Sequence, residues 1–299
     1  MRVFVTGATG LVGSTTITEL LAAGHQVLGL ARSEAAAEKL RAAGVEAHRG
    51  SLDDLDSLRR GASEADGVIH TAFNHDFSDF AASILADRKA VEVLAEELAG
   101  SDRPLVVTTG TPSGEHGELG TEETAPRGDA PAFGRFETER LVLAYAERGV
   151  RAVSVRLPRS VHGEADKHGF VPILIATARQ QGFSAYPGDG VNRWPAVHVK
   201  DAARLYRLAL EQAPAGTVLH AIGDEAVPLR QLAEIIGRHL DLPATSIPVE
   251  RAAEHWGFIG LIFALDTPAT SVVAQKLLDW QPTQPGLVAD LEAGHYFHG

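Results

Sequence analysis

The amino-acid sequence predicts an α/β protein with a doubly wound parallel sheet and a smaller C-terminal lobe. Three observations indicate this fold class. Short apolar, β-branched segments alternate with helical patterns through the first half of the 299 residues, and right-handed crossovers turn such an alternation into a parallel sheet. A glycine-rich loop follows the first of these segments. After residue 157, longer helical patterns separated by Pro- and Gly-rich loops replace the alternation.

The expected elements of the first half follow in chain order. Residues 2–7 are apolar and β-branched, as a strand buried on both faces should be, and residues 15–23 have a helical pattern that Gly24 ends. Residues 26–32 form the second strand, and Ser33 is a favourable N-cap for the Ala-rich helix after it. Further strands are expected at VEAHRG (45–50), GVIHTA (67–72), PLVVTTG (104–110) and RAVSVRL (151–157).

Composition and charge exclude several classes of protein. The chain has no Cys, which excludes disulfides, thiolate chemistry and Cys-based zinc sites. Its net charge of −12 disfavours nucleic acid or an anionic membrane as a partner, because phosphates bind to basic surfaces. The longest strongly apolar run, residues 256–265, is about half of the ~20 residues that a membrane-spanning helix needs. A strand expected from residue 2 leaves no room for a signal peptide, so we expect a cytoplasmic protein with a small-molecule substrate.

The glycine-rich loop GATGLVG (7–13) predicts a dinucleotide site. Gly7 permits the tight turn, Gly10 allows the backbone to approach a pyrophosphate, and Gly13 allows helix and strand to pack closely. The phosphates are expected on the N–H groups and the positive dipole end of the helix that the loop opens. The other loop residues expected to contact the dinucleotide are Thr9, Leu11 and Val12.

Arg32 ends the second strand, where an acidic residue would bind the adenosine ribose 2′-OH of NAD. A guanidinium at this place can instead pair bidentately with a 2′-phosphate. We therefore expect NADP(H) to be the preferred cofactor. NAD(H) is possible if Arg32 is only a solvated surface charge.

Beyond the glycine-rich loop, six segments stand in a fixed order along the chain: GSLDDLDSL (50–58), GVIHTA (67–72), LVVTTG (105–110), RLPRSVHG (156–163), NRWPAVHVKDAARL (192–205) and LLDWQPT (277–283). With the loop, they resemble the extended short-chain dehydrogenase/reductase family of NAD(P)-dependent epimerases and dehydratases over nearly the whole chain. The resemblance implies a Rossmann domain, which we expect over residues 1–157. A mainly substrate-binding lobe is expected over residues 158–299, with segments near 192–222 returning to the sheet.

The resemblance also implies positions for the rest of the cofactor. Ser51 and Leu52 would flank the adenine, although the family usually has Asp where Ser51 stands. Ala72 and Phe73 would pass under the ribose and the phosphates. Pro158 would face the nicotinamide. A further contact with the cofactor is expected from Thr108.

One pair of residues that the family normally carries is missing. The helix that begins near residue 133 usually holds Tyr-x-x-x-Lys, whose Tyr exchanges a proton with the substrate oxygen during hydride transfer. One alignment puts Phe133 and Glu137 at these positions, and the other puts Pro131 and Arg135 there. No Tyr in the chain is followed by Lys four residues later. In the second alignment Arg135 can still hold the nicotinamide ribose.

Other side chains are candidates for the proton donor or for the substrate pocket. Thr109 or Thr111 supplies the hydroxyl that usually accompanies the Tyr, although Thr has no useful acidity near neutral pH, and His162 is a third candidate donor. The candidate pocket residues are Phe133, Tyr186, Trp194, His198 and Trp256. Ordinary packing or a loop contact is the alternative role for His162, Tyr186 and Trp194. The 13 histidines show no common metal-binding spacing, so no metal is expected.

Two helices, over residues 86–98 and 135–148, correspond to those that pair across a two-fold axis in the family. They predict a homodimer with a four-helix interface. Their apolar positions recur at helical spacing: Val91, Leu94, Leu98, Leu141 and Ala144. This stripe can equally be the face that packs on the sheet.

Two functions remain open from the sequence. The first is an NADP(H)-dependent oxidoreductase that transfers hydride to a small, largely apolar organic substrate: a carbonyl, an imine or an activated C=C bond, without the Tyr-Lys proton relay. The second is a non-redox protein on the same fold, either an isomerase or cyclase or an NADP-sensing binding protein that resembles the NmrA-like regulators. The missing Tyr-Lys pair agrees directly with the second function and needs an explanation under the first.

Overall fold

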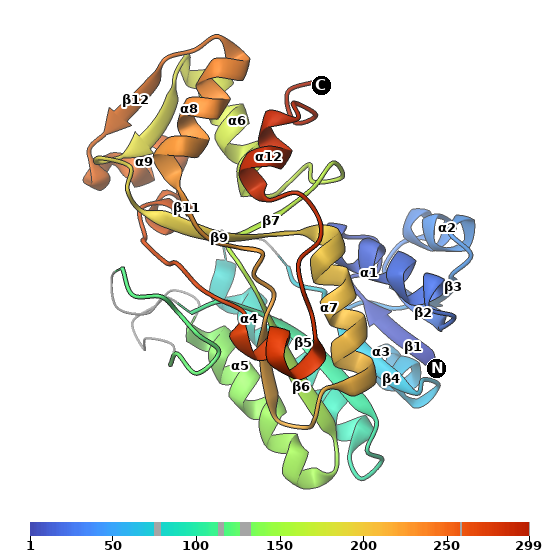
Figure 1. Cartoon of the computed structure of the whole chain (residues 1–299). Coiled ribbons are helices and arrows are strands. Elements are labelled where there is room, and N and C mark those ends of the chain that lie inside the picture. The colour runs from blue at the N-terminus through green and yellow to red at the C-terminus, as the bar shows by residue number, and fades with distance from the viewer. Residues whose placement is uncertain (75–78, 113–116, 126–132, 258, 299) are drawn as a thin grey trace.

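The computed structural model describes residues 1–74, 79–112, 117–125, 133–257 and 259–298 (Figure 1). Seven parallel strands form its central sheet. In spatial order they are β10 (Thr217–His220), β6 (Arg151–Leu157), β5 (Pro104–Gly110), β4 (Gly67–His70), β1 (Arg2–Thr6), β2 (Gln26–Ala31) and β3 (Glu46–Arg49). The strand order runs outward from β1 in both directions, which confirms the predicted doubly wound parallel sheet.

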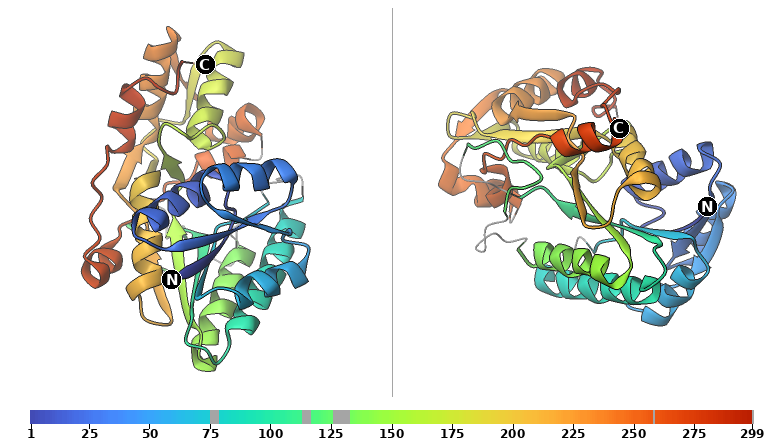
Figure 2. Two further views of the ribbon diagram at one scale, coloured as in Figure 1. Left: turned by 90° about the vertical axis from the view of Figure 1, so that its right-hand side faces the viewer. Right: turned by 60° about the horizontal axis from the view of Figure 1, so that its bottom comes forward.

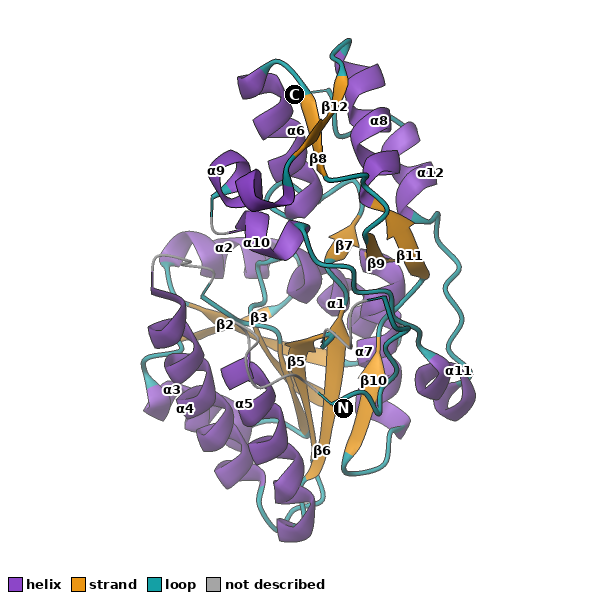
Figure 3. Ribbon diagram, turned by 90° about the vertical axis from the view of Figure 1, so that its left-hand side faces the viewer, coloured by secondary structure: helices purple, strands orange, loops and turns teal. Residues whose placement is uncertain are grey.

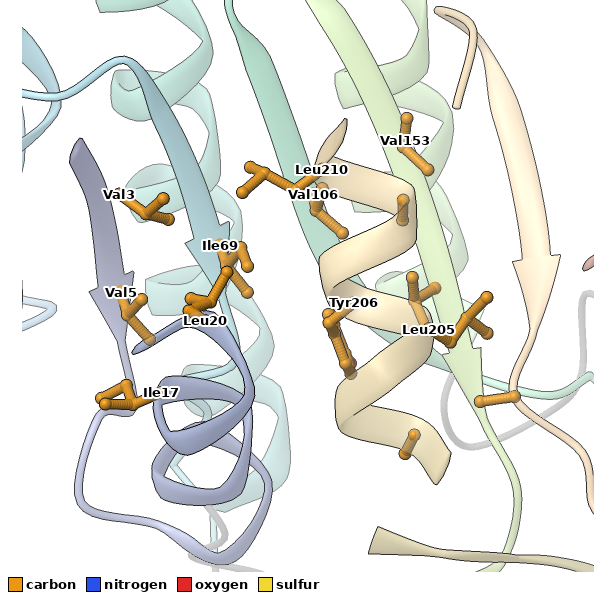
Figure 4. Close-up of a cluster of buried hydrophobic side chains, with 14 of the residues drawn as sticks. Val3, Val5, Ile17, Leu20, Ile69, Val106, Val153, Leu205, Tyr206 and Leu210 are labelled. Carbon is orange, nitrogen blue, oxygen red and sulfur yellow. The ribbon is translucent and has the colours of Figure 1, made fainter. Parts of the chain in front are cut away.

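Helices cover both faces of this sheet (Figure 2). One face carries α1 (Leu11–Ala22), α2 (Glu34–Ala42), α7 (Val199–Gln212) and α11 (Val272–Leu278), and the other carries α3 (Leu55–Ser63), α4 (Phe80–Leu98), α5 (Phe133–Ala144) and η2 (Tyr145–Arg148). On the first face, Ile17 and Leu20 of α1 pack with Val5 of the sheet, and all three are at most 3 % exposed (Figure 4). Burying each large aliphatic side chain contributes about 1.5–3 kcal/mol. This layer therefore fixes the start of α1, and with it the glycine-rich loop, on the sheet.

On the second face, α4 turns its apolar stripe inward. Val91, Leu94 and Leu98 are at most 1 % exposed and belong to one buried cluster with Leu105 of β5. These three residues of the stripe therefore pack within the chain and are not available to meet another subunit. Leu141 is half-buried and Ala144 is exposed, and the homodimer stays a prediction.

A second, smaller group of strands and helices lies above the central sheet in Figure 3. It has a three-stranded sheet of β11 (Asp224–Pro228), β9 (Arg193–His198) and β7 (Ser160–His162), and a two-stranded sheet of β12 (Ala244–Ile247) and β8 (Ser184–Pro187). Its helices are α6 (Phe170–Gln181), α8 (Leu229–Leu240), η3 (Val249–Arg251), α9 (Ala252–Trp256), α10 (Ile259–Phe263) and α12 (Leu287–Glu292). Across the described ranges, no helix is both long and apolar enough to cross a membrane.

Later segments of the chain return to the sheet. β10 pairs with β6, and α7 packs beside α1. The carboxylate of Asp201 in α7 accepts hydrogen bonds from the N–H groups of Thr283 and Gln284, and the indole N–H of Trp280 donates to the Asp201 carbonyl. The segment LLDWQPT is thus held on α7. The division of the chain after residue 157 stays a prediction.

Candidate cofactor and active site

The glycine-rich loop has a geometry that requires glycine at two positions. Gly7 has a φ of +68°, and a Cβ there would lie 2.6 Å from Thr71 Oγ1. A Cβ on Gly13 would lie 2.2 Å from the carbonyl oxygen of Gly7, so α1 packs directly on the turn. Gly10 is the N-cap of α1, no described side chain caps it, and the first turn holds no acidic residue. The first N–H groups and the positive end of the helix dipole are therefore open to an anion.

The segment after β4 passes beside this loop. The N–H of Ala72 donates to Thr6 Oγ1 at 3.3 Å, and the Thr71 hydroxyl donates to the Thr6 carbonyl at 2.8 Å. The ring of Phe73 packs edge to face with Phe80 of α4, with 5.8 Å between the ring centroids. The residues expected under the ribose and phosphates thus lie next to the turn at the start of the loop.

A buried polar chain lies behind this segment. His70 Nδ1 is 2.9 Å from Thr6 Oγ1, and His70 Nε2 is 3.1 Å from Asp87 Oδ1 in α4. His70 and Asp87 are 1 % and 3 % exposed. Sequence reasoning missed both residues. The available signal was the place of Asp87 one turn before Val91 on the apolar stripe of α4, where a carboxylate needs a buried partner.

The end of β5 and the start of α5 bring a hydroxyl, a phenol and a guanidinium together. The Thr108 hydroxyl donates to the His70 carbonyl at 2.8 Å, so the Tyr206 hydroxyl, 2.7 Å away, donates to Thr108 Oγ1. Arg135 Nη2 donates to the Thr108 carbonyl at 2.8 Å, and the guanidinium carbon lies 4.1 Å from the centroid of the Phe73 ring. Burial raises the pKa of Tyr206 and lowers the pKa of Arg135. Tyr206 is therefore a neutral structural phenol and not an acid that replaces the missing Tyr.

Thr109 belongs to a buried ionic network. Its hydroxyl donates to Glu139 Oε2 at 2.9 Å, and the Ser154 hydroxyl donates to the same oxygen at 2.5 Å. Arg156 of β6 binds Glu139 through Nε at 3.0 Å and Nη2 at 2.5 Å. Burial alone would raise the pKa of Glu139, but the hydrogen bond and charge of Arg156 outweigh it and hold that pKa below its usual value. The Thr109 proton is thus committed to a carboxylate, which argues against this hydroxyl as the donor to a substrate.

The same network reaches the second half of the chain. Arg156 Nη1 donates to the carbonyl of Glu122 at 3.2 Å and lies 3.5 Å from His220 Nε2. The Thr270 carbonyl, 2.9 Å from His220 Nδ1, can only accept, so Nδ1 carries the proton and Nε2 accepts from the guanidinium. Burial, and then the charge of Arg156, lower the pKa of His220 to about 4. A neutral His220 therefore helps hold the segments around residues 122 and 270 against β6 and β10.

The residues expected at the adenosine end lie on one edge of the sheet. Arg32 directly follows β2 and is exposed. On the neighbouring strand Arg49 is the register partner of Ala31, so a second guanidinium starts close by. Ser51 and Leu52 follow β3 and are half-buried. The structure thus brings Arg32 and Ser51 together at the carboxyl ends of adjacent strands.

His162 and His198 lie together where β7, β9 and α7 meet. His162 is fully buried, and its Nδ1 donates to Asp290 Oδ2 of α12 at 2.8 Å. Its ring packs edge to face with His198, with 5.4 Å between centroids, and His198 Nδ1 accepts from the N–H of Lys200. His162 Nε2 is buried and makes no hydrogen bond among the described residues. His162 is therefore an imidazole oriented by a carboxylate, and its role as a proton donor stays a prediction.

The aromatic pocket candidates lie within the packing of the lobe. Trp194 is fully buried with its ring 4.9 Å from Phe263, and Trp256 packs on the same ring at 5.3 Å. Tyr186 lies in β8, and the guanidinium carbon of Arg230 is 5.6 Å from its ring. Trp194, Trp256 and Tyr186 thus make ordinary packing contacts, and their role in a substrate pocket stays a prediction.

The remaining candidates lie near the carboxyl ends of β5 and β6. Thr111 is buried, and its N–H donates to the Leu157 carbonyl at 2.9 Å, next to the buried Pro158. Phe133 is the first residue of α5, but its side chain lies outside the described part of the structure, as does Pro131. Among the residues that the structure describes, no group of three or more His, Asp or Glu is placed to hold a metal ion.

Comparison with known proteins connects this geometry to a family. A model of the NAD dependent epimerase/dehydratase family matches residues 3–222. An uncharacterized protein of Schizosaccharomyces pombe is 46% identical over 299 residues, which cover 99% of this chain and 100% of that protein. The 4-hydroxy-2-methyl-3-oxo-4-farnesyl-3,4-dihydroquinoline-1-oxide ketoreductase of Stigmatella aurantiaca is 29% identical over 282 residues, which cover 86% of this chain and 80% of the ketoreductase.

Solved structures share the fold. The dTDP-glucose 4,6-dehydratase DesIV of Streptomyces venezuelae, solved with NAD and TYD bound, superposes with a TM-score of 0.80. The two chains are 19% identical, and the match covers 99% of this chain and 96% of DesIV. At that identity the likeness shows the fold alone.

Proposed function

We propose, since the chain belongs to the NAD dependent epimerase/dehydratase family, that it is an NADP(H)-dependent oxidoreductase. Its substrate is a small, largely apolar organic molecule that accepts hydride at a carbonyl, an imine or an activated C=C bond. The observation that carries the proposal is the geometry at the start of α1. No described side chain caps this helix, and it packs directly on the turn at Gly7 because Gly13 has no side chain. A dinucleotide diphosphate is the ligand that this geometry fits.

The described residues also fit the nicotinamide end of such a cofactor. Arg135 is held by the Thr108 carbonyl and by the Phe73 ring, and its Nε is buried without a hydrogen-bond partner among the described residues. A buried N–H without an acceptor is costly, and a ribose hydroxyl would satisfy it. A bound cofactor supplies the hydride, and the protein supplies binding and orientation.

Arg32 supports NADP(H) over NAD(H). Its guanidinium is exposed at the end of β2, and Arg49 starts beside it on the neighbouring strand. A guanidinium recognises a phosphate by two parallel hydrogen bonds. The Arg49 guanidinium lies 3.7 Å from Glu34, so the argument depends on Arg32: in a chain of net charge −12, this exposed arginine favours an anionic 2′ substituent over a hydroxyl.

The substrate class rests on the shortage of acids at the site. The Thr109 proton is committed to Glu139, and Tyr206 is buried with a raised pKa. Hydride transfer to a C=N or polarised C=C bond depends less on a strong acid than transfer to a ketone, for which His162 is the remaining candidate donor. The ketoreductase relative is named for a farnesyl-bearing oxo compound, which supports an apolar carbonyl compound among the three classes.

The decisive experiment follows NADPH absorbance with a panel of imines, enones and ketones. We expect consumption with at least one class and none without substrate. Binding of NADPH without consumption across the panel would refute the oxidoreductase and leave the cofactor site standing. Failure of NADPH and NADH to bind at all would refute the cofactor site as well.

The Thr109 hydroxyl donates its proton to Glu139, and this observation also favours a second function. A non-redox isomerase or cyclase, or an NADP-sensing binding protein, needs the cofactor site without a conventional acid beside it. A sensor would bind NADP⁺ and NADPH with different affinity, retain a protein partner and consume neither. Calorimetric titration with both forms, followed by a pull-down with each, separates the sensor from the reductase.

The proposal includes a homodimer in the cytoplasm. α4 and α5 lie side by side on one face of the molecule (Figure 2), and Leu85 on α4 is 58 % exposed. Leu85, and not the inward stripe, supports this pair of helices as the contact between subunits. Light scattering of the wild type and of Leu85→Lys tests it, because a charge on that face should shift the mass toward the monomer.

A further inference from the structure

The buried Asp87 stands at the start of a directional chain of hydrogen bonds. A carboxylate oxygen accepts, so His70 donates to Asp87 from Nε2, and with the ring proton on Nε2 the Nδ1 accepts the Thr6 hydroxyl proton. Thr6 Oγ1 in turn accepts the N–H of Ala72. Each polar group in this series of hydrogen bonds has a partner, and the last bond, to Ala72, fixes the backbone of the segment expected beneath the cofactor ribose.

Asp87 also acts on the other side of that segment. Burial lowers the pKa of Arg135, and the charge of Asp87 is the largest influence that opposes the change. The Arg135 guanidinium lies over the Phe73 ring, and Phe73 directly follows Ala72. Asp87 therefore influences the same short segment by two routes: through His70 and Thr6 to Ala72, and through the charge of Arg135 to Phe73.

We propose that Asp87 is a positioning residue for the nicotinamide-ribose half of the cofactor site. Through His70 and Thr6 it fixes the backbone of the Thr71–Phe73 segment. The Arg135 guanidinium lies on the Phe73 ring of this segment, and its buried Nε has no hydrogen-bond partner among the described residues, so it is open to a ribose hydroxyl. Asp87 makes no ion pair with Arg135 in the described structure, but its charge favours the charged form of that buried guanidinium, so its removal changes the position or the hydration of the group. The adenosine half of the site, at the ends of β2 and β3, is not part of this hydrogen-bond network. The inference rests on the proposed binding of NADP(H).

Two probes separate the two halves of the site. NADPH spans both, whereas 2′,5′-ADP occupies the adenosine half and has no nicotinamide ribose. In D87N the amide oxygen can still accept from His70 Nε2, so the variant removes the charge and keeps the shape. We expect D87N to weaken NADPH binding about tenfold, because the guanidinium loses the largest charge that favours its charged form, and to leave the affinity for 2′,5′-ADP unchanged.

A double-mutant cycle tests whether Asp87 acts through Arg135. We expect R135Q to weaken NADPH as well, and D87N to add less than about twofold in the R135Q background, because the charge that it acts on is gone. E211Q is the matched control: it makes the same change at another carboxylate–His pair, that of Glu211 and His25, which are 2.8 Å apart and outside the proposed site, and it should leave the affinity for both probes unchanged. D87S is a second charge-removing variant should D87N not fold.

The outcomes are distinct. An equal loss of NADPH and 2′,5′-ADP in D87N, or the same loss with and without Arg135, means that Asp87 only supports the fold and overturns the inference. Unchanged NADPH affinity in D87N overturns it too. Absence of NADPH binding by the wild type would instead refute the proposed function, before any variant is compared.

Discussion

The buried pair of Glu139 and Arg156 offers the sharpest test of what holds the site together. Their side chains are 3 % and 5 % exposed. Glu139 accepts hydrogen bonds from Arg156, Thr109 and Ser154, with the Arg156 contacts between 2.5 and 3.2 Å. The substitution E139Q keeps the shape of the side chain, removes its charge, and places an amide donor among groups that are themselves donors.

The expected cost follows from the burial of both partners. Removing one partner of a buried ion pair leaves an uncompensated charge and costs about 3–5 kcal/mol. A chain of this size loses roughly 2–4 °C of Tm per kcal/mol. E139Q should therefore melt about 10 °C below the wild type. Replacing both partners by Met should recover at least half of the loss, because the buried charge is then gone.

Thermal unfolding followed by circular dichroism measures this difference, and E96Q is the matched control. Glu96 pairs with Arg148 across the surface, and the two side chains are 48 % and 50 % exposed. The same chemical change at that pair should lower Tm far less, since water replaces the lost interaction. Equal losses in the two variants would refute the claim that the buried network is a principal source of stability.

The pH dependence supplies a second check on the same variant. The charge and hydrogen bonds of Arg156 hold the pKa of folded Glu139 below its ordinary value of 4.5. The stabilisation is therefore complete above the pKa of the unfolded state and is lost as pH falls through the lower pKa of the folded state. The Tm difference between wild type and E139Q should be full at pH 7 and should shrink below pH ~4.5. A difference that stays constant into acid would contradict the assignment of the effect to this charge.

Three further predictions concern other parts of the structure. G13A places a Cβ 2.2 Å from the Gly7 carbonyl oxygen. Calorimetry should therefore show a lower Tm, and fluorescence titration should show no NADPH binding. An NADPH affinity equal to that of the wild type would contradict the packing of α1 on the loop. R32A should weaken NADPH binding about 10–100-fold, as the loss of charged hydrogen bonds implies, and should leave the affinity for NADH unchanged. The control R59A should leave both affinities unchanged. An equal loss of NADH affinity in R32A would exclude a role for Arg32 in binding a 2′-phosphate. Burial lowers the pKa of His220 to about 4 from 6.5, so the unfolded state binds more protons than the folded state between these pH values. The wild type should therefore lose folding stability of the order of 3 kcal/mol as pH falls from 6.5 to 4. Acid denaturation curves of H220Q should lack that dependence.

The sheet and the glycine-rich loop could be predicted because their signals are local. A β-branched run such as residues 104–110 is typical of a strand that is buried on both faces of a parallel sheet. The roles of Gly7 and Gly13 depend on atoms only a few residues away, apart from the contact with Thr71. For the same reason the seven-stranded sheet agrees with the predicted order of strands and helices.

The polar networks could not be predicted, because each joins residues that are distant in sequence. His70 meets Asp87, and Glu139 meets Arg156, only after helices pack on the sheet. The role of an apolar stripe is equally a matter of packing: the period of Val91 and its neighbours suits a sheet contact or a subunit contact, and burial decides for the sheet. A polar residue on such a stripe, as Asp87 is, marks that a partner exists but does not say which one.

The central claim is that the start of α1, with Arg32 at the adenosine end, binds NADP(H). Calorimetric titration of the purified wild type with NADPH and with NADH tests it most directly. We expect one saturable site per chain and an NADPH affinity at least about tenfold higher than that for NADH. No binding of either coenzyme at millimolar concentration would contradict it.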